Sequence, residues 1–586
     1  MQVLYQKGDD MPRSLYGQIT ETGLQTHEGA AQYAISDPRL DLVFTKGSVI
    51  FQAGFYQSQQ DELQAFIKAL LAAEKAEPGF GWKYGAWMRD PQKGKGNRIQ
   101  GSVVPAVLCA NFPEETDLIR RYVPLCLKWR PDDAIAFVAH FENLGLGEMP
   151  EAAKEAMAEA LGEYDSYQIL KYSKTQVDRL AKRKTKKDKD AQKSLRLVDV
   201  MGICKKYLGS SLEAAYEYLS ATTAQRRGID ARPEQTGLAV AQHKLFRGRE
   251  PDMDMVANAR PSIAQALSVF GNKKATWEAL FNVINPSLVP DLALLLNIRN
   301  LAKAGYTPAQ IESEIGNRPF NGIWPHQVYS GYKTVTQGST RRNREHEALP
   351  QYGPVFEQIL TDLVEQWLPA MRSLGFADVS DSMMTKISEK SEATLREVAL
   401  VLTACTAATS GFAASFSDHG YIDKLDGYTG PLDLVTRSLQ LQRGMGSTQV
   451  YGAVMDTLGY IQQNKIAPFR CLYFFSDMQF HPPRQEAPDS NYATSHRSSP
   501  PLELALRNWQ EALGEPPLVV LWNLSSYTGS PLQCDYPGVA FVSGYDAQTF
   551  KHLQEWFKNG GQTVSVSQVT GKQETMAELL DFIRSF

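Results

Sequence analysis

The chain has 586 residues and a mass of 65.3 kDa, with 43% hydrophobic and 22% charged residues. This composition excludes a disordered, collagen-like or disulfide-scaffold protein, and the length allows several domains with large cores. The 61 basic and 65 acidic residues give a net charge of −4, which excludes a globally basic nucleic-acid binder but not a locally basic one.

The six cysteines are widely spaced and include no C-x-x-C pair, which argues against a zinc ribbon and fits a reducing compartment. The first residues carry charges where a signal peptide needs an apolar stretch. The apolar stretch 399–416 contains hydroxyl residues and is interpreted as a buried helix that leads into a buried strand, not as a membrane span. We therefore expect a cytoplasmic protein with no membrane partner.

Residues 58–310 have the apolar periodicity of successive helices. In 61–75, for example, Leu63, Phe66, Ile67 and Leu70 fall on one helical face. The same spacing predicts helices over 118–128, 132–142, 151–163, 210–221, 262–270, 274–284 and 291–304. Short turns between these helices favour stacked antiparallel pairs, as in helical-repeat proteins.

After about residue 350, apolar runs alternate with helical segments, which is typical of a doubly wound, mainly parallel sheet. The predicted strands are 411–416, 469–475, 517–524 and 538–542. The predicted helices are 389–409, 431–441, 448–463, 501–513, 547–558 and 574–585. The sequence thus predicts a multidomain α plus α/β protein, with a helical repeat domain over 1–350 and an α/β domain over 351–586.

Three loops of the second domain contain oxygen donors where strands end or helices begin. They are the D-x-S-x-S sequence from Asp378 to Ser382, the Gly-Ser-Thr sequence that ends at Thr448, and Ser476-Asp477. Ligands bind such sheets at the carboxyl ends of the strands. Two carboxylates with neutral hydroxyls suit a hard divalent cation, and we expect Mg²⁺. The predicted ligands are Asp378, Ser380, Ser382, Thr448 and Asp477. The D-x-S-x-S sequence taken alone is equally compatible with a helix N-cap that binds no metal.

A basic stretch runs from Lys171 to Arg196, where eleven Lys or Arg and three Asp give a local charge of +8. Its lysine-rich centre lacks apolar anchors, so it suits either a solvated loop or a binding site for phosphates. The basic residues considered for contact with RNA at its centre are Lys182, Arg183, Lys184, Lys186 and Lys187.

The three metal loops in this order resemble the metal-ion-dependent adhesion site of von Willebrand factor A domains, over about residues 370–586. The resemblance implies metal-binding roles for Asp378, Ser380, Ser382, Thr448 and Asp477. Asp381 stands where the family usually has glycine.

A long helical half followed by such a domain resembles the Ro autoantigen family, whose helical part is the TROVE module. The segments that carry this similarity are 105–110, 169–174, 294–308, 322–326 and 534–546. The family resemblance implies a ring of HEAT-like helical repeats that binds small structured Y RNAs on a basic face and single-stranded ends of misfolded RNA in a central hole. It also implies a role in RNA quality control, in bacteria together with exoribonucleases. By position, Lys171 and Lys174 match a stretch implicated in RNA contact, and Arg299 matches a helix near the interior of the ring.

Two hypotheses about function follow. The first is a Ro-type RNA-binding ribonucleoprotein component that is not an enzyme. The alternative is a metal-dependent scaffold that grips an acidic residue of a partner protein, such as an exoribonuclease, through the A-domain site. No nucleophile motif such as G-x-S-x-G accompanies the metal loops, so we predict no catalysis.

Overall fold

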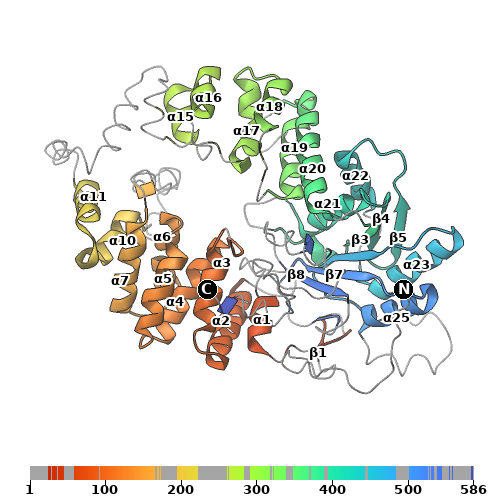
Figure 1. The fold of residues 1–586 in the computed structure, drawn as a ribbon, viewed down its shortest axis with the longest axis horizontal. Helices are drawn as coiled ribbons and strands as arrows, with labels where there is room; N and C mark the ends of the chain where they lie inside the picture. The colour runs from red at the N-terminus through yellow and green to blue at the C-terminus, as the bar shows by residue number, and fades with distance from the viewer. Residues whose placement is uncertain are drawn as a thin grey trace, which may run out of the picture.

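The structure is a computed structural model. It describes most of residues 24–46, 59–164, 195–221, 261–337, 347–482 and 500–543, with short gaps, and a few isolated positions elsewhere. The described elements follow a ring-like path: two groups of helices form an arc, and an α/β domain lies between the two ends of the arc (Figure 1).

The first group of helices packs around one core. It consists of α1 (Pro38–Phe44), α2 (Gln59–Ala76), α3 (Phe80–Arg89), α4 (Arg98–Asn111), α5 (Thr116–Leu127), α6 (Pro131–Asn143), α7 (Glu151–Gly162), α10 (Leu197–Ile203) and α11 (Ser210–Ser220). Their shared core includes Phe66, Trp82, Trp87 and Phe137. Neighbouring helices in the chain pack against each other, as expected for stacked helical repeats.

Local signals fix where these helices begin. The side chain of Asn97 accepts the amides of Ile99 and Gln100, so α4 begins at Arg98. Pro105, the first residue of the similar segment 105–110, lies inside α4. Because proline has no amide hydrogen, Pro105 cannot donate to the carbonyl of Gly101, and α4 lacks one backbone hydrogen bond there.

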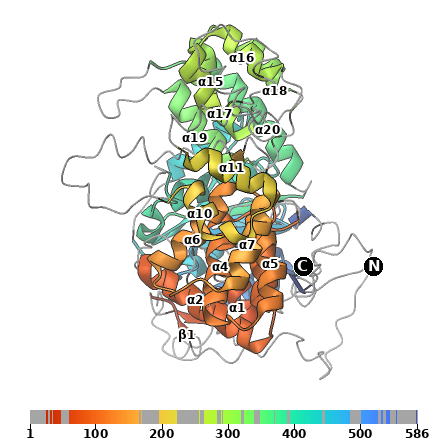
Figure 2. The ribbon, with the colours of Figure 1, turned by 90° about the vertical axis from the view of Figure 1, so that its left-hand side faces the viewer.

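The second group of helices consists of α15 (Ile263–Phe270), α16 (Lys274–Phe281), α17 (Asp291–Lys303), α18 (Pro308–Ile315), α19 (Pro325–Thr336) and α20 (Gly353–Trp367). Figure 2 shows α15, α16 and α18 at one end of the molecule and α1 and α2 at the other. The core of this group continues without a break into one face of the sheet, so residues 256–364 and the sheet share a single cluster. The predicted boundary at 350/351 therefore stays a prediction.

The α/β domain contains a six-stranded sheet in the order β5-β4-β3-β6-β7-β8. The strands are β3 (Ser373–Asp378), β4 (Phe412–Phe416), β5 (Gly420–Lys424), β6 (Cys471–Ser476), β7 (Leu518–Asn523) and β8 (Val539–Ser543). All neighbours are parallel except the edge strand β5, which is antiparallel to β4. The helices α21 (Leu395–Ala407) and α22 (Pro431–Ser438) cover one face, and α23 (Val450–Gln463) and α25 (Pro501–Leu513) cover the other.

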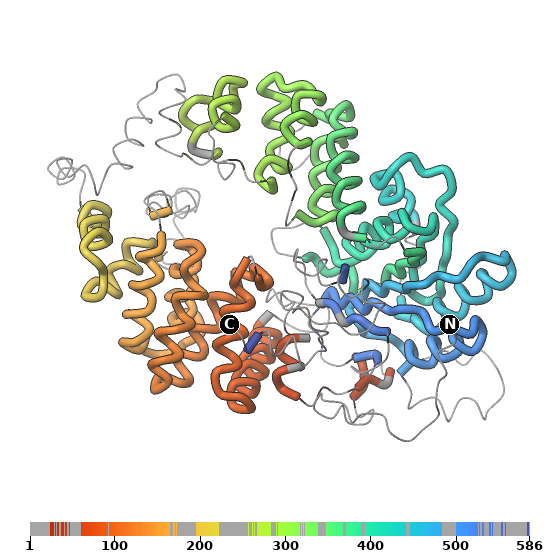
Figure 3. The backbone as a smooth tube through the Cα atoms, in the orientation of Figure 1, coloured from red at the N-terminus to blue at the C-terminus, as the bar shows by residue number. Residues whose placement is uncertain are grey.

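Two segments connect the α/β domain to the first helices. A short hairpin, β1 (Leu24–Gln25) and β2 (Ala31–Gln32), lies against loops of the α/β domain and precedes α1. From the other end of the chain, Ile583 is buried in the core of the first helical group. Arg584 binds Glu77 through two hydrogen bonds of 2.7 Å. The ring path is therefore closed on this side by both ends of the described chain (Figure 3).

The predicted fold class is confirmed, and the predicted elements within the described residues match observed helices and strands. The stretch 399–416 forms the end of α21 and all of β4, as expected. The predicted helices over 547–558 and 574–585 lie almost wholly outside the described residues. Among the described helices, none is long and apolar enough to cross a membrane.

Candidate functional site

The candidate metal site begins where β3 ends. All six residues of β3 are buried, and Asp378 is its last residue. The backbone amide and the hydroxyl of Ser380 donate to Asp378 Oδ1 at 3.0 and 2.6 Å. The hydroxyls of Ser380 and Ser382 lie 3.2 Å apart. This turn gathers the three side chains of the D-x-S-x-S sequence and leads into the 3-10 helix Asp381–Met384.

The end of β6 joins this cluster because β6 lies parallel to β3 and directly beside it. Ser476 Oγ donates to Asp378 Oδ2 at 2.5 Å. The next residue, Asp477, accepts the amide of Gln479 through Oδ1 at 3.1 Å. The parallel register thus brings two carboxylates that are 99 positions apart in the chain to one edge of the sheet.

Thr448 lies in the third loop, directly before α23. Its amide donates to Nδ1 of His481 at 2.7 Å, and the amide of His481 donates back to the carbonyl of Thr448 at 2.9 Å. His481 follows β6 by five residues, so this pair ties the Thr448 loop to the loop of Asp477. The structure thereby brings all three predicted loops together.

The electrostatics of this cluster favour a bound cation. Each of the five predicted ligands is at most 4% exposed. Burial, and then the negative charge of Asp477, raises the pKa of Asp378 to about 7. Among the described residues, the hydrogen-bond donors to the Asp378 carboxylate are Ser380 and Ser476, which are uncharged. Two carboxylates that repel each other in a buried site are stabilised by a divalent ion.

The donor set fits a hard cation. The side chains offer two carboxylates and three hydroxyls, a set suited to Mg²⁺. No group of three or more His, Cys, Asp or Glu side chains that could hold a metal occurs among the described residues. The site would therefore depend on serine and threonine hydroxyls to complete the coordination. When bound, the ion would supply positive charge that holds the loops together and can attract an anionic group.

Of the predicted RNA-contact residues, the structure describes only Arg299. Lys171, Lys174, Lys182, Arg183, Lys184, Lys186 and Lys187 lie outside the described residues. Arg299 is described, on α17, and its guanidinium binds backbone carbonyls. It donates to the carbonyl of Glu347 at 2.6 Å, to that of Val335 at 3.1 Å and to that of Thr334. Its role in RNA contact stays a prediction.

The sequence and the fold were compared with known protein families and solved structures. Residues 372–579 match a family described as a domain of unknown function, DUF7788. No curated protein matches the sequence. The crystal structure of the Ro protein (RSR) of Deinococcus radiodurans is similar, with a TM-score of 0.54 and 14% identity, over 90% of this chain and 100% of that chain. The chain has a Ro-like fold. A helical repeat domain is followed by a von Willebrand factor A-like α/β domain, as the sequence predicted.

In this Ro-like fold, sequence reasoning assigned no role in the site to two residues beside the metal loops. Asp418 follows β4 and accepts the amide and the hydroxyl of Ser447 through Oδ1, at 3.0 and 2.6 Å. A side chain at Gly446 would meet the Asp418 carboxylate at 2.5 Å, so glycine is needed there. His481 is the second, through its bonds to Thr448. Asp418 does lie at the end of a predicted strand, which was a usable signal, whereas nothing in the sequence pairs His481 with Thr448.

Asp381, which replaces the usual glycine of the A-domain motif, is exposed. It faces solvent and lies outside the buried cluster.

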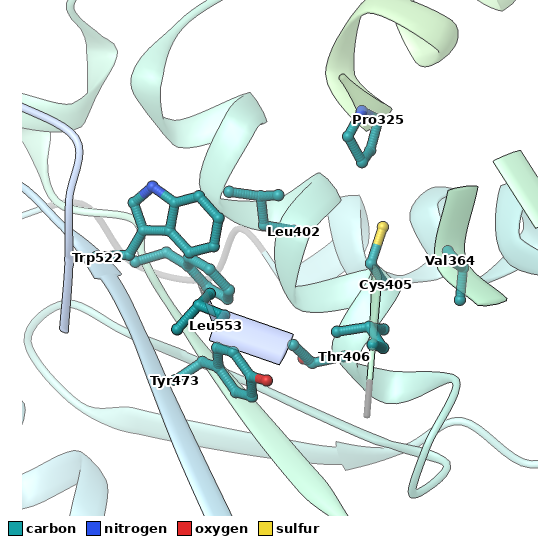
Figure 4. A pocket seen from close by; sticks show the side chains of 10 residues that line it. Pro325, Val364, Leu402, Cys405, Thr406, Tyr473, Trp522 and Leu553 are labelled. Atoms are coloured by element: carbon teal, nitrogen blue, oxygen red, sulfur yellow. The ribbon is translucent and has the colours of Figure 1, made fainter. Parts of the chain in front are cut away.

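A separate apolar cavity lies between α20, α21 and the sheet (Figure 4). Its lining includes Pro325, Leu402, Cys405, Tyr473 and Trp522, and none of its lining residues is charged. It therefore offers no charged group for a metal ion or a phosphate, and its polar side chains are Cys405, Thr406 and Tyr473.

Proposed function

We propose that the protein is an RNA-binding protein of Ro type. It would bind small structured RNAs on a basic helical surface and single-stranded RNA ends inside the ring, and act in RNA quality control. The observation that carries the proposal is the Ro-like fold across both domains, with the whole of the RSR chain covered. Because fold alone does not fix function, the local chemistry of the helical domain must also suit RNA.

The basic surface that supports this proposal lies where α4 and α6 begin. The Arg130 guanidinium donates to the Tyr172 hydroxyl at 2.6 Å, so Tyr172 is anchored beside α6. Tyr172 is the chain neighbour of Lys171 and lies two residues before Lys174. Tyr172 is thus the described residue of the basic stretch 171–196 that lies next to Arg130.

Three arginines, Arg89, Arg98 and Arg130, pair with two carboxylates, those of Asp132 and Asp133, so positive charge exceeds negative charge by one at this surface. Arg98 and Arg130 are 44% and 43% exposed, and both pair with Asp132. Burial, and then the charge of Arg130, lowers the pKa of Arg98. Two exposed guanidiniums that repel each other would gain from contact with a phosphate group.

Cations lie beside aromatic rings close to Arg98 and Arg130 in the sequence. Lys128 lies 5.3 Å from the ring centre of Trp129, and Lys95 lies 5.8 Å from that of Trp87. Trp129 and Lys128 are both partly exposed. Of these two rings only that of Trp129 is suited to stacking with a single-stranded base, because Trp87 is 1% exposed.

The test is fluorescence anisotropy with a small structured RNA and a single-stranded oligonucleotide, each titrated over a range of salt. We expect affinity to fall steeply with salt for both RNAs. Replacement of Lys182, Arg183, Lys184, Lys186 and Lys187 by glutamine should weaken binding and flatten the salt dependence. Arg130→Gln should reduce the slope by about one phosphate contact, or roughly 0.7–0.9.

Arg120→Gln is the matched control, because Arg120 is also an exposed arginine of this helical group and pairs with Glu155 at 3.0 Å. It should leave the affinity unchanged. Absence of binding to both RNAs, or binding that does not respond to salt, would overturn the proposal.

The metal has a supporting role in this proposal, and no catalytic step is assigned to it. Mg²⁺ at Asp378 and Asp477 would stabilise the A-like domain. The described cysteines are all free and buried, which suits a reducing compartment such as the cytoplasm.

The buried oxygen cluster supports a second candidate function. This function is a metal-dependent contact with an acidic residue of a partner such as an exoribonuclease. The low exposure of the five ligands means that a partner carboxylate would reach the ion only after the surrounding loops move. Pull-down of partners with Mg²⁺ or EDTA tests this role. Capture should require Mg²⁺ and be lost in Asp378→Ala but not in the exposed control Asp381→Ala. Capture that survives EDTA would exclude it.

A further inference from the structure

The N-terminal hairpin, residues 24–33, lies directly on the loop that carries Asp477. Thr26 Oγ1 donates to the carbonyl of Phe480 at 2.7 Å, and Gln32 Nε2 donates to that of Met478 at 3.0 Å. The amide of His27 donates to Gln479 Oε1 at 3.0 Å. Three consecutive loop residues thus receive hydrogen bonds from the hairpin.

The hairpin also binds the loop after β7. Tyr33 and Ser530 exchange two backbone hydrogen bonds, of 2.9 and 3.1 Å. The rings of His27 and Tyr527 meet edge to face at 5.5 Å. Thr26 and Gln32 are 6% and 2% exposed, so the contact is well sealed from water.

The same Met478–Phe480 loop also makes hydrogen bonds with the predicted metal ligands and Ser476. Asp477 Oδ1 accepts the amide of Gln479, and the Met478 amide donates to Ser476 Oγ at 2.9 Å, which in turn binds Asp378. Met478 has a φ of 61°, a left-handed conformation that is unfavourable for methionine. Such a conformation persists only where its surroundings fix it.

The hairpin leads straight into the first helices. Asp37, which precedes α1, pairs with Arg39, and Arg39 pairs with Glu77 at 2.6 Å. The hairpin therefore contacts the Met478–Phe480 loop and is followed in the chain by α1, whose Arg39 pairs with Glu77.

We propose that the metal site and the N-terminal hairpin are coupled, so that a divalent ion at Asp378 and Asp477 fixes the Met478–Phe480 loop for the hairpin and strengthens ring closure. This inference rests on the metal site and goes beyond RNA binding. Coupling between two sites is reciprocal, so the docked hairpin also raises the affinity for the ion by the same factor.

The experiment is hydrogen exchange by mass spectrometry on the full chain, with saturating Mg²⁺ or with EDTA. Mg²⁺ should slow exchange of the amides in 24–33 and 478–480 by about fivefold or more, the lower range of allosteric coupling. Amides of α7, which is far from both sites in the chain and in the fold, should not change.

Isothermal titration with Mg²⁺ tests the reciprocal effect. Gln32→Ala removes the hydrogen bond to Met478 and should weaken Mg²⁺ binding by about fivefold. Gln25→Ala is the matched control, because Gln25 is an exposed glutamine of the same hairpin, and it should leave Mg²⁺ affinity unchanged.

Absence of Mg²⁺ binding, unchanged exchange of the hairpin on binding, or equal effects of Gln25→Ala and Gln32→Ala would each overturn the coupling. None of these measurements involves RNA, so failure of the coupling is distinct from failure of the RNA-binding proposal.

Discussion

Asp378 has both carboxylate oxygens in hydrogen bonds to serine hydroxyls, and it is fully buried beside a second carboxylate. Without a cation, burial and the negative charge of Asp477 disfavour its ionised form and outweigh the serine hydrogen bonds, which favour that form. This gives the metal site a measurable dependence on pH.

The stability of the metal-free protein should fall as the pH rises from about 4 to about 7. The folded pKa of Asp378 is raised from 3.8 to about 7, so the folded state holds a proton that the unfolded state has lost. The corresponding loss is roughly 4 kcal/mol at most, and thermal unfolding in EDTA measures it. Saturating Mg²⁺ should restore stability above pH 7, because the ion favours the ionised carboxylate.

Asp378→Asn should largely remove the pH dependence in EDTA, whereas exposed Asp381→Asn should leave it as in the wild type. A flat profile for the wild-type protein in EDTA would contradict this account.

Arg299 is a predicted RNA contact whose side chain forms hydrogen bonds with backbone carbonyls in the folded protein. Arg299→Ala removes charged hydrogen bonds to three carbonyls at and beyond the end of α19 and should destabilise the protein by about 1.5–3 kcal/mol. Arg299→Lys should recover only part of this loss, because an ammonium cannot reach all three carbonyls at once. Urea unfolding measures both variants. Full recovery by lysine would show that charge alone matters at this position.

At the scale of elements, the packing of α21 on β3 depends on the absence of a side chain at Gly375. A Cβ there would lie 2.4 Å from Thr406 Oγ1 and 3.0 Å from the Cα of Thr403. Backbone on α21 cannot easily move, because α21 is buried along nearly its whole length.

Gly375→Ala should therefore destabilise the α/β domain by about 1–3 kcal/mol and reduce Mg²⁺ affinity, since β3 ends at Asp378. Gly459→Ala is the matched control. Gly459 lies inside α23 with no atom near its would-be Cβ, so alanine should stabilise the helix by up to about 1 kcal/mol. Denaturant unfolding compares the two variants, and equal effects would contradict the steric argument.

The sequence predicted best those elements that have one polar face. Helix α2 shows a clear apolar stripe, but nine of the ten residues of α3 are buried, so α3 has no polar face to reveal its period. The edge strand β5 was missed because it is only partly buried and includes charged residues. At the site, the order of the loops along the chain predicted the metal cluster. The contacts of Asp418 and His481 depend on how distant loops meet, which local patterns do not encode.

At the scale of the whole molecule, each end of the described chain packs against the domain that is farther away in the sequence. The N-terminal hairpin lies on the α/β domain, while Ile583 and Arg584 lie against the first helices (Figure 1). Each domain therefore completes part of its packing with a segment from the far end of the chain.

Ile583→Ala should destabilise the first helical group by about 2–4 kcal/mol, because Ile583 is fully buried in its core. Hydrogen exchange should show the loss in α1 and α2 more than in the sheet. Uniform loss across both domains would mean that the chain unfolds as one unit, and no loss would mean that the contact is dispensable.

The pair formed by Glu77 and Arg584 spans 507 positions of the chain. At ordinary rates of protein synthesis, roughly 25–100 s pass between the appearance of Glu77 and that of Arg584. During this interval the first helices must stay folded, or be kept from aggregating, with part of their core still missing. Ring closure by this pair thus follows the appearance of the first helices by at least that interval, in which chaperones that bind exposed apolar surface have time to act.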